Sequence, residues 1–183
     1  MRITEVMTPV LAALVVIGLV VWYWANRVDR LNRRVDRARS SLRQQLTRRA
    51  AAMLDLALSH ALDPASSIVL AATARRALEL PVEDVAARAA AESELSEAAR
   101  AALGEADDVA ELRSSGAEEL VAQLGRTWYR AVLARRFYNE AVNQARRLRR
   151  RRGVRWFRLA GRTPEPVTFE IDDGWPDALG AAP

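Results

Sequence analysis

Near the N-terminus, twenty consecutive residues from Val6 to Ala25 carry no charged side chain. A helix of this length spans roughly 30 Å, which is the thickness of the hydrocarbon core of a bilayer. Trp22, Tyr23 and Trp24 stand at the C-terminal end of the run. Amphipathic aromatic rings favour the membrane–water interface. The run therefore predicts a transmembrane helix and an anchor over residues 1–26.

A cleaved signal peptide and a soluble core helix are the alternatives for this run. The first fits less well, because Arg2 is offset by Glu5 and small residues are missing at both cleavage positions after the run. The second fits less well, because the run is apolar on every face.

Many arginines follow the run closely, beginning with Arg27 and Arg30. The positive-inside rule then places the N-terminus outside and the remaining chain in the cytoplasm.

The next segment predicts a long amphipathic helix over residues 28–62. Apolar residues recur at steps of three and four, which form one stripe on a helix, and no Pro or Gly occurs between Gly18 and Pro64. Nothing separates this helix from the membrane span, so we expect one continuous rod. Asp63 and Pro64 predict an N-cap and a new helix start. We expect the other helices at 64–80, 82–106 and 116–152, and a loop at 107–115 between the last two.

Four amphipathic helices with short links predict an all-α fold, an antiparallel up-down four-helix bundle with coiled-coil-like packing over 27–153. Gly153 is the expected C-cap, and the tail at 154–183 is expected to be irregular, with a short strand-like stretch at 167–171. In the up-down order the last helix returns to the membrane, and Trp156 and Phe157 reach interfacial depth. If Pro81 only kinks one long helix, that end points away instead.

Charge is distributed in blocks along the chain. Residues 26–49 hold nine Arg and two Asp (+7), residues 63–119 five Arg and thirteen acids (−8), and residues 126–162 thirteen Arg and one Glu (+12). The stretch 163–183 holds five acids and no base. Such blocks suit segments that pack against one another, and they equally suit independently solvated faces. Both interpretations stay open.

The arginine run that ends in Arg149, Arg150, Arg151 and Arg152 has three interpretations. It binds an anionic membrane surface, it binds nucleic-acid phosphates, or it is a solvated helix end favoured by the helix dipole. The sequence argues against nucleic acid, because Trp156 lies beyond a glycine and the chain is tethered to a membrane.

No motif in the sequence indicates catalysis. His60 is the single histidine, there is no cysteine, and no Gly-rich phosphate loop occurs. The acid pairs, such as Asp172 with Asp173, are adjacent in sequence and are poor catalytic dyads. We therefore expect no enzyme activity, no cofactor, no metal and no small-molecule substrate.

Three segments resemble the LemA family of bacterial membrane proteins. They are NRVDRLNRRVDRARSSLRQQLTRR (26–49), ESELSEAARAAL (92–103) and ARRFYNEAVN (134–143). The sequence departs from the family at Arg39, where tryptophan is usual, at AAAMLDLA (50–57), and in lacking a proline after the third segment. The residues that match the family motifs are Arg34, Val35, Asp36, Gln45, Leu46, Arg48, Arg49, Arg135, Tyr138, Asn139 and Val142.

The resemblance implies one membrane helix, a four-helix bundle and no enzymatic activity or cofactor. With the reasoning above, it predicts a scaffold or interaction module in the bacterial cytoplasmic membrane. Its partners would be the lipid bilayer and other membrane proteins or a second copy of the chain. The alternative is a tethered regulator that binds anionic lipid or nucleic acid through its arginines. The candidate interface residues are Trp22, Tyr23, Trp24, Arg27, Arg30, Arg149, Arg150, Arg151, Arg152, Trp156 and Phe157.

Overall fold

A computed structural model describes residues 2–80, 84–156 and 164–181 of the chain. Over these residues the protein is all-helical and contains no strand. The predicted strand-like stretch at 167–171 is therefore wrong, and the tail there is irregular. The helices are α1 (Arg2–Leu58), α2 (Pro64–Glu79), α3 (Val85–Leu103), α4 (Ala106–Leu112), η1 (Arg113–Ala117), α5 (Glu118–Arg149), α6 (Arg152–Trp156) and η2 (Asp177–Leu179).

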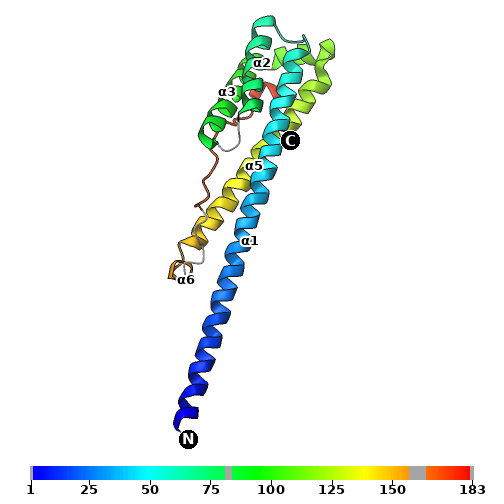
Figure 1. Cartoon of the computed structure of the whole chain (residues 1–183). Coiled ribbons are helices and arrows are strands. Elements are labelled where there is room, and N and C mark those ends of the chain that lie inside the picture. The colour runs from blue at the N-terminus through cyan, green and yellow to red at the C-terminus, as the bar shows by residue number, and fades with distance from the viewer. Residues whose placement is uncertain (1, 81–83, 157–163, 182–183) are drawn as a thin grey trace. The chain divides into compact units, whose positions relative to one another are not determined.

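Helix α1 is one continuous helix, as the absence of Pro and Gly after Gly18 predicts (Figure 1). By length and composition it is the one helix in the described residues that is long and apolar enough to cross a membrane. Side chains along its apolar segment are open to the surroundings, and Leu11 and Leu14 are 65% and 61% exposed. No other described residue covers this apolar surface.

Helix α2 begins as the sequence predicts. Asp63 is its N-cap, and its carboxylate accepts hydrogen bonds from the backbone N–H groups of Ala65 (2.9 Å) and Ser66 (3.0 Å). A hydrogen bond from the Ser66 side chain, together with these backbone bonds, holds the pKa of Asp63 below its ordinary value. The helix ends at Glu79, and Leu80 is extended. Pro81, the predicted breaker, lies outside the described residues.

The predicted loop at 107–115 is wrong, because these residues are helical. The chain breaks earlier, at Gly104, whose positive φ of 56° ends α3. Helix α4 follows at once with a capping box, in which the side chains of Glu105 and Asp108 each bond the backbone of the other residue. A π-helical turn then leads into α5, with Gly116 at φ 98°.

The end of α5 also differs from the expected helix 116–152. The helix stops at Arg149, and residues 150–151 form a turn before α6. Gly153 lies inside α6 and has no positive φ, so its predicted role as C-cap is wrong.

The chain forms two compact units. Unit 1 comprises Met1–Arg37 and Glu140–Thr168, and unit 2 comprises Ala38–Asn139 and Phe169–Pro183. The boundaries that the sequence predicts at residues 26 and 153 both fall inside unit 1. The core of unit 2 is built from α1, α2, α3, α4 and α5, with Leu56, Leu95 and Leu124 fully buried. The antiparallel order of a four-helix bundle stays a prediction.

Candidate functional site

In unit 1 the end of α5 and the short helix α6 lie against α1. Val28 of α1, Leu148 of α5 and Val154 of α6 form a small buried core, against which Trp24 packs. The Arg149 guanidinium donates to Asn32 Oδ1 over 3.3 Å. These contacts place the arginine run beside the part of α1 that directly follows the apolar segment.

We call the exposed arginines around this small core the basic collar. They are Arg27, Arg30, Arg147, Arg150, Arg151, Arg152 and Arg155. Within the collar, a cavity of about 260 Å³ is lined by Arg27, Arg147 and Arg151, with Leu31 and Leu148 as apolar walls and Gln144 beside them. The collar thus combines convergent positive charge with apolar surface.

Aromatic side chains accompany the collar. Trp22 is 68% exposed and Trp156 is 85% exposed, whereas Trp24 is half-buried and packs edge-on against Tyr23 with ring centroids 5.8 Å apart. Phe157 lies outside the described residues. Gly153, three residues before Trp156 in α6, lies beside Trp24, because a Cβ placed on Gly153 would lie 3.9 Å from Trp24 Nε1.

A polar network follows the collar along α5. Arg34 donates to Gln144 Oε1 (3.1 Å), and Gln144 Nε2 donates to Glu140 Oε1 (2.8 Å). Arg147 also binds Glu140 (3.1 Å). The hydrogen bond from Gln144 and the positive charge of Arg147 hold the pKa of Glu140 below its ordinary value. Arg147 is thus the one arginine of the collar that pairs with an acid among the described residues.

In unit 2 the acidic tail is held on α5 by two motif residues, which we call the tail clamp. Arg135 forms a bidentate ion pair with Asp173, with N···O distances of 2.6 and 2.9 Å. Asn139 donates through Nδ2 to the Phe169 carbonyl (3.1 Å) and accepts through Oδ1 from the Phe169 N–H (2.9 Å). Trp128 Nε1 donates to the Asp173 carbonyl (3.2 Å). The tail therefore packs in a fixed register, although residues 169–173 have no regular secondary structure.

A further arginine, on α3, binds the same tail. Arg100 pairs with both carboxylate oxygens of Asp172. The Asp172 carboxylate also accepts a hydrogen bond from the Gly174 N–H (3.1 Å). The backbone N–H of Asp172 donates to the Ser93 hydroxyl (3.0 Å). The hydrogen bonds from Arg100 and Gly174 hold the pKa of Asp172 below its ordinary value.

Unit 2 also contains a buried charge triad of Arg49, Glu92 and Arg88. Glu92 is fully buried and accepts from Arg49 Nη2 at 2.8 Å and from Arg88 Nε at 2.9 Å. Arg49 also donates to the Ser96 hydroxyl (3.1 Å), and its guanidinium lies 5.2 Å from the ring centroid of Trp128. Two arginines against one carboxylate leave a net charge of +1 in the triad.

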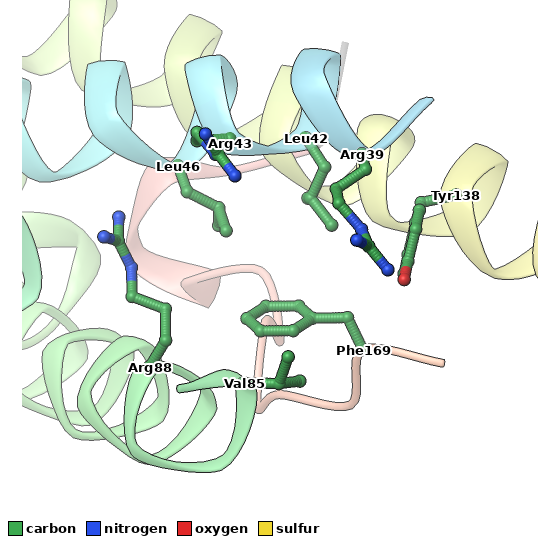
Figure 2. A pocket seen from close by; sticks show the side chains of 8 residues that line it. All are labelled: Arg39, Leu42, Arg43, Leu46, Val85, Arg88, Tyr138 and Phe169. Atoms are coloured by element: carbon green, nitrogen blue, oxygen red, sulfur yellow. The ribbon is translucent and has the colours of Figure 1, made fainter. Parts of the chain in front are cut away.

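The other motif residues have simpler surroundings. Val35 and Val142 are buried, as are Leu46 and Tyr138, and Gln45 is half-buried. Leu46 and Tyr138 line one cavity, seen in Figure 2. Asp36 and Arg48 are exposed.

Sequence reasoning missed Arg88, Glu92 and Ser96, which are all buried polar residues of α3. A signal was present, because residues 88, 92, 95, 96 and 99 fall on one face of a helix. It also missed the partners of the tail, for which the only signal was the opposite charge of the two segments.

Among the residues that the structure describes, no group of three or more His, Asp or Glu could hold a metal ion. Comparison with family models, curated proteins and solved structures finds no match to this chain.

Proposed function

We propose that this protein is a single-pass, membrane-anchored scaffold or interaction module of the LemA type, with no enzymatic activity. Residues 6–25 of α1 span the bacterial cytoplasmic membrane, the N-terminus is outside, and the remaining chain is an antiparallel up-down four-helix bundle in the cytoplasm. The basic collar contacts the anionic headgroups of the cytoplasmic leaflet. Partners are the bilayer and other membrane proteins or a second copy.

One observation carries this proposal: in unit 1 the arginine run lies against α1 immediately after its apolar segment. A bilayer around that segment would meet exposed arginines of α1, α5 and α6 together. Each basic residue near an anionic leaflet contributes roughly 1 kcal/mol of attraction. Trp22 and Trp156, both largely exposed, have the amphipathic character of interface anchors.

The motif residues add support for the LemA-type assignment. Arg49 forms part of a buried triad, and Arg135 and Asn139 hold the tail. Positions that make such contacts are constrained by the fold, which accounts for a motif without any catalytic role.

Because the chain has no cysteine, a single spin label can be attached to it at one introduced cysteine. We would label Trp156→Cys in the full chain, reconstituted in nanodiscs of phosphatidylcholine with or without phosphatidylglycerol. The proposal predicts that phosphatidylglycerol raises the oxygen accessibility of the label and lowers its accessibility to a water-soluble nickel reagent. High salt should reverse this change, because it screens the collar.

The matched control is Asp36→Cys, an exposed position twelve residues beyond Trp24 on α1 and therefore about 18 Å further along the helix. This label should stay in water in both lipids. The lipid proposal is contradicted if phosphatidylglycerol does not change the accessibility of the Trp156→Cys label and the protein binds duplex DNA in a salt-sensitive way. Nucleic acid would then be the partner of the basic collar.

Orientation has a separate test. A reporter fused after Pro183 that is active only in the cytoplasm supports the assigned direction. A fusion that is active only outside the membrane overturns it.

A further inference from the structure

Unit 2 has a cavity of about 160 Å³ with apolar walls and a positively charged rim. Leu42 and Leu46 of α1 lie on one side of it, and Val85 of α3 and Phe169 of the tail on the other (Figure 2). The Arg39 guanidinium lies beside the Tyr138 side chain at one end of the view. An interior space of about 150 Å³ is enough to hold a six-carbon ring.

The charges around this cavity favour an anion. Arg39, Arg43 and Arg88 line it, and no acidic residue of the described chain does. Arg39 and Arg43 make no ion pair with another described residue, and Arg88 belongs to the buried triad, which carries an excess positive charge. Arg88 Nη2 is buried and has no hydrogen-bond partner among the described residues, so the local donor supply exceeds the acceptors.

The two halves of the cavity select different parts of a ligand. Four of the eight lining side chains are pure hydrocarbon, namely Leu42, Leu46, Val85 and Phe169. They suit a hydrocarbon body of about six carbons, by the volume comparison above. The Arg39 guanidinium presents a planar set of donors, which matches a carboxylate.

We propose that this cavity binds a small amphiphilic monocarboxylate, with the carboxylate at Arg39 and the hydrocarbon body between Leu42, Leu46, Val85 and Phe169. Phe169 belongs to the tail that Asn139 holds, so an occupied cavity would also strengthen the attachment of the tail. This site lies wholly in unit 2 and does not depend on the basic collar.

The experiment uses the full chain in phosphatidylcholine nanodiscs, with empty nanodiscs to correct for partitioning into lipid. Calorimetric titration with hexanoate should show saturable binding of one molecule per chain, and 1-hexanol should bind more weakly. Arg39→Gln should weaken hexanoate binding about tenfold, through the lost charge-assisted hydrogen bond, and leave hexanol unchanged. Arg48→Gln, an exposed arginine of the same helix outside the cavity, is the matched control and should bind as the parent does.

A second variant tests the location. Val85→Phe adds volume inside the cavity at a position that is 42% exposed, where a larger side chain can be accommodated without loss of the fold. It should abolish the binding of hexanoate and hexanol while the circular dichroism and melting temperature match those of the parent. The proposal is overturned if hexanoate shows no saturable binding, if hexanol binds as well as hexanoate, or if folded Arg39→Gln and Val85→Phe variants both bind like the parent.

Discussion

Glu92→Gln should destabilise unit 2 more than any exposed charge substitution. The carboxylate of Glu92 is fully buried, and it lies 2.8 Å from Arg49 Nη2 and 2.9 Å from Arg88 Nε. A glutamine has almost the same shape but no charge, so two buried guanidinium groups would remain with no opposite charge. Removing one partner of a buried ion pair costs about 3–5 kcal/mol in the free energy of unfolding. That loss lowers the melting temperature by roughly 6–20 °C for a chain of this size.

The assay is unfolding of the full chain in nanodiscs, followed by far-UV circular dichroism. Glu94→Gln is the matched control on the same helix: its ion pair with Arg76 is exposed (45% and 60%), so its loss should cost less than about 1 kcal/mol. The double variant Glu92→Gln/Arg49→Met should be more stable than Glu92→Gln alone, because one uncompensated cation is removed. The reasoning is refuted if Glu92→Gln and Glu94→Gln unfold alike, or if Arg49→Met worsens Glu92→Gln.

Three further predictions concern the tail and the end of α1. Asn139→Ala removes two hydrogen bonds to Phe169 and should weaken tail docking by about 1–3 kcal/mol, seen as faster amide hydrogen exchange over residues 169–175. The Gly174 amide shift should titrate with Asp172 below the ordinary pKa of 3.8, and Arg100→Gln should move the midpoint upward. Because that pKa is lowered in the folded protein, Asp172 stabilises the docked tail above pH 3.8, and this contribution is lost as the pH falls through the lowered value. His60 has a positive φ of 61°, so His60→Gly should raise the free energy of unfolding by up to about 1 kcal/mol in a urea titration.

Local signals in the sequence were sufficient for part of the helix layout. The lack of Pro and Gly over residues 19–63 predicted a continuous α1, and Asp63 with Pro64 predicted the start of α2. The loop at 107–115 was wrong because its acidic and polar residues resemble a loop in composition. Their effect depends on position: Asp108 faces the start of α4 and completes a capping box, which stabilises a helix.

The buried triad was harder to predict. Arginine is so common in this chain that a single arginine says little about whether its position is buried or functional. Arg49 follows Leu46 by three residues and precedes Met53 by four, so it stands on the apolar stripe of α1. That position indicates burial, and a buried arginine needs an acid nearby. The sequence does not say which acid, because Glu92 is 43 residues away and is brought close only by the fold.

The tail illustrates the same limit. Its five acids and the thirteen arginines of residues 126–162 indicate attraction between the two segments. Attraction between opposite charges does not determine which residues pair, however. It therefore does not predict the ion pair of Arg135 with Asp173, nor the hydrogen bonds of the uncharged Asn139 with Phe169. These pairings depend on the fold, which brings the tail back to α5.

The central claim is that the arginine run returns to the segment of α1 that leaves the membrane. Spin labels at Arg30→Cys and Arg150→Cys, in the full chain in anionic nanodiscs, measure this by double electron–electron resonance. Neighbouring helices have axes about 8–10 Å apart, so the account predicts a narrow distribution below roughly 25 Å once the label arms are included. If the end of α5 pointed away, its 32 residues would separate the labels by about 45 Å or more. A distribution centred at that longer distance would contradict the account.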